Sequence, residues 1–389
     1  MIPIRYNLRS LAVRKTTTIA TALGIALVVF VLASSQMMSA GIHNTLGKSG
    51  DASRALVMRK GADAELSSNL ETRLVALILS GPGVKKSANG TPLGVGELLM
   101  VISLEKPGTN GMVSNVAVRG VPENVYELRR NAKVTSGRAA RPGADEVVIG
   151  KRIEHQFTGL EIGQKFELKK NLPVTVVGVF EADGSSQESE VWADLDTARN
   201  AFGRDGLVSS VTVELESPSK FEAFRSHMER DRQLGLQAFS EPVYYEKQSE
   251  STAMLVTALG SAVVFFFSIG AIIGAMITMY AAVAHRKREV GTLRALGFSR
   301  FTIMTSFLLE SVMLALIGGA AGALASLAMG MVKFSMMNFT SFSEMTFKFD
   351  PSPDILISAV LLGGLMGVLG GLFPALQAAR TSPVEAMRD

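Results

Sequence analysis

Four long stretches with almost no charge constrain this chain more than any other feature of its sequence. A helix needs about 20 apolar residues to cross about 30 Å of hydrocarbon, and each stretch is at least that long. They are 16–42, 251–284, 301–332 and 355–379. Residues 43–250, of ordinary polar character, separate the first stretch from the second. The sequence therefore predicts a membrane α-helical protein with four transmembrane helices and one large mixed α+β domain.

Basic residues assign the sides of the membrane. The segments before 16, at 285–300 and after 379 together hold 11 basic and 3 acidic residues, whereas 48–250 holds 26 basic and 28 acidic. Short cytoplasmic segments keep an excess of lysine and arginine. We therefore expect both ends and 285–300 in the cytoplasm and the large domain outside it. The net charge of +4 reflects this topology and does not indicate a nucleic-acid partner.

These two patterns give a complete expected layout. The first stretch is too long for the 7–15-residue apolar core of a signal peptide, which favours an uncleaved anchor. Before it lies either an amphipathic segment on the inner leaflet or a merely basic flank. The expected parts are 1–15, an amphipathic cytoplasmic segment; 16–42, the first span; 43–250, the extracytoplasmic α+β domain with a helical stalk from about 242; 251–284, the second span; 285–300, a cytoplasmic helix; 301–332, the third span; 333–354, a short outer loop; 355–379, the fourth span; and 380–389, a cytoplasmic tail.

Within the large domain, alternating and β-rich runs predict strands. The leucine spacing in 63–79 predicts a helix, and Gly203 is expected to end a short helix that begins near Asp194. The expected strands are 98–104, 113–121, 145–150, 173–180 and 210–216.

Residue types exclude most chemistry. The chain has no cysteine, which removes disulfides, a thiol nucleophile and cysteine-ligated metals. His43, His155, His227 and His285 share no metal-ligand spacing. Gly47-Lys48-Ser49 resembles the end of a phosphate loop, but Ile42 stands where that motif needs glycine. We therefore expect no catalytic residue, metal, cofactor or nucleotide site in this chain.

Glu310 is the one ionisable residue inside an apolar stretch. Such a residue is a functional candidate because an unpaired charge in hydrocarbon is costly. Proton coupling is one interpretation, but no acid, histidine or lysine lies inside the other three stretches. A structural or gating role is favoured.

Small residues at every fourth position let membrane helices approach closely. We expect these glycines to pack helices within the chain, and at least one glycine face to meet another subunit. The positions are Gly270, Gly274, Gly318, Gly322, Gly363, Gly367 and Gly371.

The 285–300 connection, HRKREVGTLRALGFSR, is amphipathic. A cationic helix between two spans could rest on the lipid headgroups. Alternatively, Val290, Leu293 and Leu296 form an apolar face that seats in a groove of a partner.

The same segment resembles the cytoplasmic loop of the MacB/FtsX-like ABC transporter permeases. The tail FPALQAARTSPVEAMRD, the entry NLRSLAVRKTTTIATALGIALVV and the outer-domain stretch VTVVGVFEADGSSQESEVWADLD are similar to the corresponding parts of that family. The loop match is carried by Arg286, Arg288, Glu289, Val290, Gly291, Arg294, Ala295, Leu296 and Gly297.

The resemblance implies a permease in the bacterial inner membrane. It implies a dimer with an identical or similar copy and a pair of ABC ATPase subunits docked on these residues and Leu293. ATP and Mg²⁺ would then belong to the ATPase, whose cycle moves the outer domain to export or extract a substrate; a periplasmic adaptor is a further expected partner. MacB carries its ATPase before the first helix, where this sequence has only 1–15, so we expect the ATPase on a separate chain. The alternatives are a lipoprotein-releasing permease, and a membrane receptor or regulator of cell-envelope enzymes.

Overall fold

A computed structural model describes residues 15–230 and 233–382 of the chain. The described residues divide into two compact units. The helical unit comprises 15–41, 254–333 and 348–382, and the sheet unit comprises 42–253 and 334–347. The amphipathic segment expected at 1–15 lies outside the described residues except for Lys15, as does most of the expected tail.

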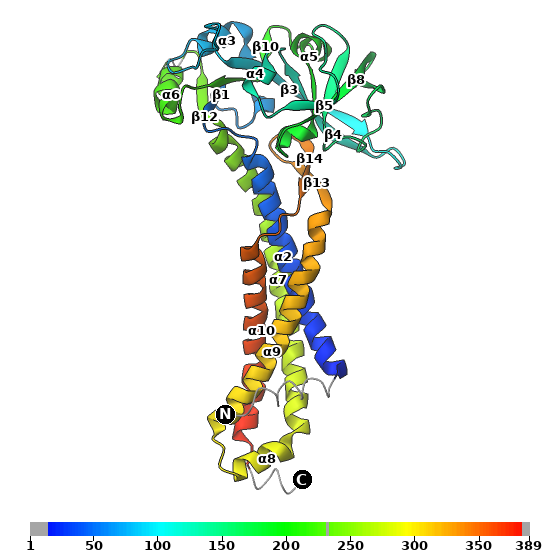
Figure 1. Cartoon of the computed structure of the whole chain (residues 1–389), viewed down its shortest axis with the longest axis vertical. Coiled ribbons are helices and arrows are strands. Elements are labelled where there is room, and N and C mark those ends of the chain that lie inside the picture. Colours follow the sequence, from blue (N-terminus) through cyan, green and yellow to red (C-terminus); the bar gives the residue numbers. More distant parts are fainter. Residues whose placement is uncertain (1–14, 231–232, 383–389) are drawn as a thin grey trace. The chain divides into compact units, whose positions relative to one another are not determined.

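The helical unit contains the four expected spans, which run alongside one another in Figure 1. All four are long and apolar enough to cross a membrane, which confirms the helical part of the predicted fold. Two of the four, α2 and α7, continue into the sheet unit. The helices are α2 (Lys15–Gly47), α7 (Glu241–His285), α8 (Lys287–Ala295), α9 (Arg300–Ser326, extended by the 3₁₀ helix η4, Leu327–Met331) and α10 (Pro353–Arg380).

Side-chain caps explain where two of these helices begin. The Ser299 hydroxyl accepts a hydrogen bond from the Thr302 amide at 3.1 Å, and the Ser352 hydroxyl accepts one from the Ile355 amide at 3.4 Å. Serine at an N-cap satisfies an amide that the helix itself leaves unpaired. The local sequence therefore fixes the starts of α9 and α10.

The sheet unit is built on a ten-stranded mixed sheet of order β12-β1-β11-β3-β4-β9-β6-β8-β5, with β7 paired to β8. The pairs β4–β9 and β6–β8 are parallel, and the other strand pairs described in this sheet are antiparallel. The strands of this sheet are β1 (Arg54–Arg59), β3 (Gly94–Glu105), β4 (Val113–Val121), β5 (Lys133–Gly137), β6 (Glu146–Gly150), β7 (Lys165–Lys169), β8 (Leu172–Glu181), β9 (Glu190–Asp194), β11 (Ser210–Glu214) and β12 (Leu236–Ser240).

Short helices cover this sheet, and buried apolar clusters lie between them (Figure 1). One cluster includes Val118, Ile149 and Val176, and another packs Val57 and Val213 against Phe224. The remaining elements are η1 (Glu65–Ser67), β2 (Leu70–Glu71), α3 (Thr72–Leu79), α4 (Val125–Leu128), η2 (Ser186–Ser189), α5 (Leu195–Phe202), β10 (Leu207–Val208), η3 (Pro218–Lys220) and α6 (Phe221–Arg230).

All five expected strands are present, and the mixed α+β fold is confirmed. The Asp194 carboxylate caps α5 by accepting from the Thr197 amide at 3.1 Å, and Gly203 ends it with φ of 63°, as predicted. The helix expected over 63–79 is wrong in its first half. Leu70 belongs to β2, which pairs with β10, and α3 begins only at Thr72. Pairing with a distant segment overrides the local leucine spacing there.

The connection 333–354 is more than the short loop expected from the sequence. It forms the hairpin of β13 (Lys333–Asn338) and β14 (Ser343–Lys348), whose residues 334–347 belong to the sheet unit. The Glu344 carboxylate accepts hydrogen bonds from the Lys106 ammonium, at 2.7 Å, and from the Ser114 hydroxyl. The third connection between spans thus contributes to the large domain.

Candidate functional site

The segment that joins α7 to α9 forms the short helix α8 and a tight turn. The Phe298 amide bonds to the Leu293 carbonyl and the Gly297 amide to the Arg294 carbonyl, both at 3.1 Å. This is the double bond pattern of a Schellman ending, which needs a left-handed residue. Gly297 supplies it with φ of 93°. The helix predicted over 285–300 is thus confined to Lys287–Ala295.

One face of α8 packs into the helical unit. Val290 is 2% exposed and joins a cluster with Ile303, Phe307 and Ala378. Gly291 is also buried, and Leu293 and Arg294 are half-buried. The expected apolar face is therefore divided, because the bundle itself covers Val290.

The opposite face of α8 is open. Leu296 is 72% exposed, although it lies outside the four apolar spans. Arg288, Glu289 and Ala295 are exposed beside it. If α8 docks on a partner, these are the side chains that this conformation offers.

Arg286 joins the start of α8 to Glu310 of α9. Its Nη1 lies 2.8 Å from Glu310 Oε2, its Nε lies 3.1 Å from Glu289 Oε2, and its guanidinium lies 4.9 Å from the Phe307 ring centroid. Glu310 is 3% exposed. Burial of this carboxylate is offset by a direct ion pair, which supports the structural or gating interpretation.

Five of the seven expected packing glycines lie against other helices of the same chain. A β-carbon on Gly318 or Gly322 would collide with the α2 backbone at Ala22 or Ala26. A β-carbon on Gly363, Gly367 or Gly371 would meet Val29 or residues of α9. These contacts fit the close approach that small residues permit.

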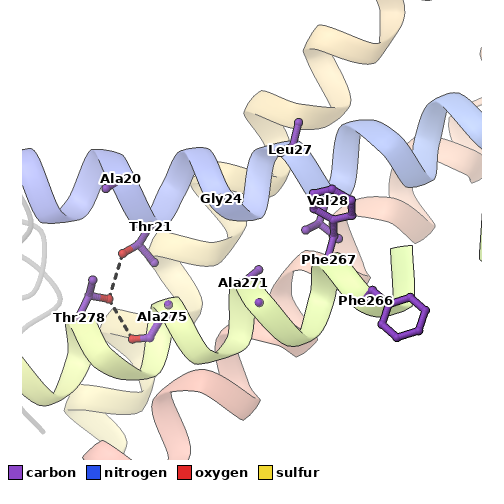
Figure 2. A pocket seen from close by; sticks show the side chains of 12 residues that line it. Ala20, Thr21, Gly24, Leu27, Val28, Phe266, Phe267, Ala271, Ala275 and Thr278 are labelled. Atoms are coloured by element: carbon purple, nitrogen blue, oxygen red, sulfur yellow. Dashed lines mark hydrogen bonds between the residues drawn. The ribbon is translucent and has the colours of Figure 1, made fainter. Parts of the chain in front are cut away.

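The other two glycines, Gly270 and Gly274 of α7, have no atom within 4 Å of an added β-carbon. They line an apolar groove of about 510 Å³ between α2 and α7, together with Gly24 (Figure 2). At one end the Thr21 hydroxyl donates to the Thr278 hydroxyl at 2.9 Å and ties the two helices together. No residue that the structure describes covers this glycine face.

The sheet unit contains a buried cluster of charges. Arg119 on β4 bonds to Glu65, Glu97 and Glu190 with its nearest contacts between 2.7 and 3.0 Å, and its side chain is 3% exposed. Burial opposes ionisation of Glu97, but Arg129 and Arg119 outweigh it and lower its pKa to about 2. Glu97 thus stays charged inside the unit.

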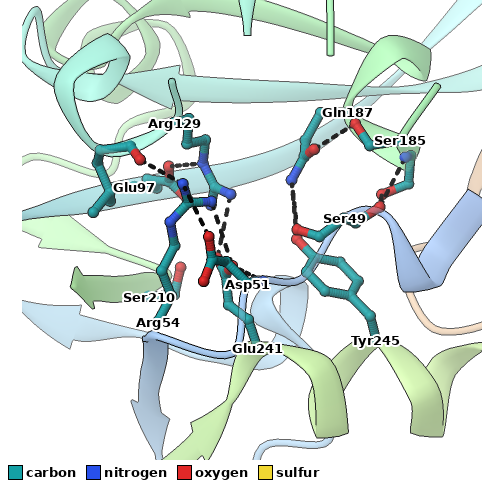
Figure 3. Close-up of polar contacts among 12 residues, drawn as sticks. Ser49, Asp51, Arg54, Glu97, Arg129, Ser185, Gln187, Ser210, Glu241 and Tyr245 are labelled. Atoms are coloured by element: carbon teal, nitrogen blue, oxygen red, sulfur yellow. Dashed lines mark hydrogen bonds and ion pairs between the residues drawn. The ribbon is translucent and has the colours of Figure 1, made fainter. Parts of the chain in front are cut away.

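The cluster continues to the first residue of α7 (Figure 3). Arg129, just after α4, lies 3.0 Å from Glu97 and 3.3 Å from Glu241. Arg54 of β1 lies 3.7 Å from Glu241, and the Asp51 amide donates to the same carboxylate at 3.1 Å. Residues from β1, β3, β4, β9 and α7 therefore meet in one network.

Sequence reasoning did not find this cluster, because its members are interleaved with surface charges and spread from 54 to 241. The signal that was available is Arg119, a lone charge in the apolar strand run of 113–121. Among residues 15–230 and 233–382 no group of three metal-ligating side chains gathers. The expectation of no cofactor in this chain stays a prediction.

Two family models match the chain. The MacB-like periplasmic core domain matches residues 16–231, and the FtsX-like permease C-terminal domain matches residues 261–383. The first match spans more than half of the chain.

Curated relatives include macrolide export ATP-binding/permease proteins MacB. The one from Burkholderia thailandensis is 29% identical over 291 residues, covering 70% of this chain, and the one from Burkholderia pseudomallei is 30% identical over 293 residues, also covering 70%. A probable export ATP-binding/permease protein of Pseudomonas fluorescens is 29% identical and covers 69%. The chain spans 42–43% of the length of these relatives.

Two solved structures are similar at a distance. The extracellular domain of the noncanonic ABC-type transporter YknZ from Gram-positive bacteria gives a TM-score of 0.36 at 15% identity, covering 48% of this chain and 99% of that one. The periplasmic region of MacB from Actinobacillus actinomycetemcomitans gives 0.37 at 12% identity, covering 50% and 92%.

Proposed function

Since the chain belongs to the MacB/FtsX-like family of ABC transporter permeases, we propose that it couples ATP hydrolysis by an ABC ATPase to motion of its sheet unit, for export or extraction of a substrate. It is a membrane protein with an extracytoplasmic domain. Its place is the bacterial inner membrane, and the ATPase, with its ATP and Mg²⁺, is a pair of subunits on separate chains.

The observation that carries this proposal is the two-sided packing of α8. Val290 and Arg286 hold the helix to the bundle, while Leu296 is left 72% exposed. A helix that is fixed to the bundle on one face and open to a partner on the other can transmit a movement of that partner to the bundle. We assign the ATPase contact to the segment Arg286–Gly297, with Leu296 as its apolar anchor.

The route to the sheet unit is α7. This helix runs without interruption from Glu241 to His285 and ends one residue before α8 begins. Its first residue lies in the buried charge cluster. A displacement of α8 therefore reaches that cluster along one continuous helix.

A second copy of the permease completes the proposed assembly. The open glycine face of Gly24, Gly270 and Gly274 supports an interface there, because the other packing glycines are already covered by the chain's own helices. A periplasmic adaptor is a further proposed partner of the sheet unit.

Leu296→Glu tests the docking assignment. Burying a leucine contributes about 1.5–3 kcal/mol, so its replacement by a carboxylate should lower ATPase affinity at least tenfold. The chain and the ABC ATPase subunit of the same organism are co-purified in detergent and in lipid, and ATPase activity is measured in the complex. Met112→Glu, at a 61% exposed apolar residue of the sheet unit, is the matched control and should behave as wild type.

Wild-type association and ATPase activity in Leu296→Glu would refute the assignment. If α8 only rests on lipid headgroups, charge reversal at Lys287 and Arg288 disturbs membrane placement while Leu296→Glu leaves association intact.

A further inference from the structure

The first three turns of α7 bury a polar face. The positions that face the rest of the sheet unit follow the helical repeat, and a helix that packs on a core normally places apolar residues there. Here all but Ala253 are polar, with exposed fractions of 7% or less. The polar members are Glu241, Tyr244, Tyr245, Gln248, Ser249 and Thr252.

Attachment is strongest at the start of this face. Glu241 meets Arg129, Arg54 and the Asp51 amide (Figure 3). Hydrogen bonds to charged groups are stronger than those between neutral groups. The charge cluster therefore anchors the first residue of α7 to strands β1, β3 and β4.

Neutral contacts follow along the helix. The Tyr244 hydroxyl accepts from the Glu65 amide at 3.2 Å, and the Tyr245 hydroxyl accepts from Gln187 at 3.4 Å. Farther along, Gln248 accepts from Asn338 at 3.4 Å. These contacts join neutral groups, and each has an equivalent replacement in water.

At the far end of the polar face, one buried hydroxyl lacks a hydrogen-bond partner in the part of the chain that the structure describes. Ser249 makes one contact outside α7, 2.9 Å from the His43 ring, and its hydroxyl also donates to the Glu246 carbonyl of α7 itself at 2.7 Å. The Thr252 hydroxyl is 0% exposed and has no hydrogen-bond partner among the described residues. A buried hydroxyl without a partner is destabilising, and exposure to water relieves it.

We propose that this polar face is a seam that opens from its Thr252 end about Glu241 as the pivot. An apolar face would resist separation because it exposes hydrocarbon to water. When the polar seam opens, its neutral hydrogen bonds are replaced by hydrogen bonds to water, and the Thr252 hydroxyl gains a hydrogen bond that it lacks in the closed state. The opening is a property of this chain alone, and its test needs neither ATP nor an ATPase, so it stands apart from the proposed function.

Single cysteines test the opening, because the native chain has none. Thr252→Cys and Ser249→Cys are compared in the full chain in lipid nanodiscs, using a small charged methanethiosulfonate. The matched control is Thr212→Cys, since Thr212 on β11 is also 0% exposed with an unpartnered hydroxyl. We expect the thiol at 252 to react about tenfold faster than that at 212, with position 249 between them. Equal rates at 252 and 212 would overturn the seam.

The pivot is tested in the Ser249→Cys background. Adding Glu241→Gln should raise the labelling rate at 249, because the anchored end is weakened. The control is Arg130→Gln, which removes an exposed arginine that pairs with the buried Glu214 and should leave the labelling rate at 249 unchanged. A slow thiol at 212 in the Glu241→Gln chain verifies that the fold is intact. An unchanged rate at 249 in that intact chain would overturn the pivot.

Thr252→Val gives a change of opposite sign. Removing the unpartnered hydroxyl should stabilise the closed seam and slow the reaction at 249. Partial unfolding cannot imitate this result, since it accelerates labelling. A faster reaction at 249 in Thr252→Val would contradict the seam.

Discussion

Replacing Glu310 by glutamine should loosen the attachment of α8 to α9. The substitution keeps the size of the side chain and removes its charge, which leaves the buried Arg286 guanidinium, 2.8 Å away, without its ionic partner on α9. Removing one member of a buried pair typically costs about 3–5 kcal/mol.

Local features lower that figure here. Arg286 retains Glu289, whose side chain is 58% exposed, and a partly exposed pair of this kind contributes about 0–1 kcal/mol. The Phe307 ring adds about 0.5–1 kcal/mol of cation–π attraction. The glutamine oxygen also still accepts a hydrogen bond. We therefore expect Glu310→Gln to destabilise the purified chain by about 2–4 kcal/mol.

A double-mutant cycle separates this pair from general damage. Unfolding in lipid–detergent micelles is measured for Glu310→Leu, Arg286→Met and the two together. If the ion pair is the cause, the double variant costs much less than the sum of the single variants, because no buried charge is left unpaired. Additive costs, or a wild-type stability in Glu310→Gln, would refute the reasoning.

Four further outcomes are expected. In the cysteine-free chain, Ser219→Cys should react with an impermeant thiol reagent from outside intact cells and Ser299→Cys only after lysis; the reverse result would invert the topology. Gly322→Ala should destabilise the monomer by about 1–3 kcal/mol, because its β-carbon meets the α2 backbone. Gly274→Leu should keep the fold but weaken self-association, and cross-linking yields equal to wild type would remove α7 from the dimer interface. The pKa of Glu97 is lowered from 4.5 to about 2, so its stabilising effect is complete above pH 4.5 and is lost as the pH falls toward 2. Glu97→Gln should destabilise the chain at neutral pH and flatten the acid limb of a thermal-unfolding series, and an unaltered acid limb would contradict the assigned pKa.

Much of the fold could be predicted from local sequence. Four apolar stretches can satisfy their backbone in a bilayer only as helices, and the structure has helices there. Alternating runs such as 210–216 gave strands, and Asp194 and Gly203 set the limits of α5, because capping and left-handed endings depend on residues a few positions apart.

The helix contacts of the candidate site were only partly predictable from the sequence. Glycine spacing identified positions of close approach, but five of the seven could be assigned to the chain's own helices only once their neighbours were known. Amphipathicity likewise marked α8 without showing which side of it is covered. Val290 is held by the bundle and Leu296 is open, a division made by α9 and α10 rather than by the segment itself.

The sequence by itself determined that this chain is a four-span membrane protein with a large polar domain, because hydrophobic runs and charge bias act locally and without a partner. Only the tertiary structure decided what pairs with what. Glu310 meets Arg286, the 333–354 connection joins the sheet unit, and Glu241 meets Arg129. Such contacts join residues that lie tens or hundreds of positions apart, and their free energy depends on burial and geometry that no local pattern encodes.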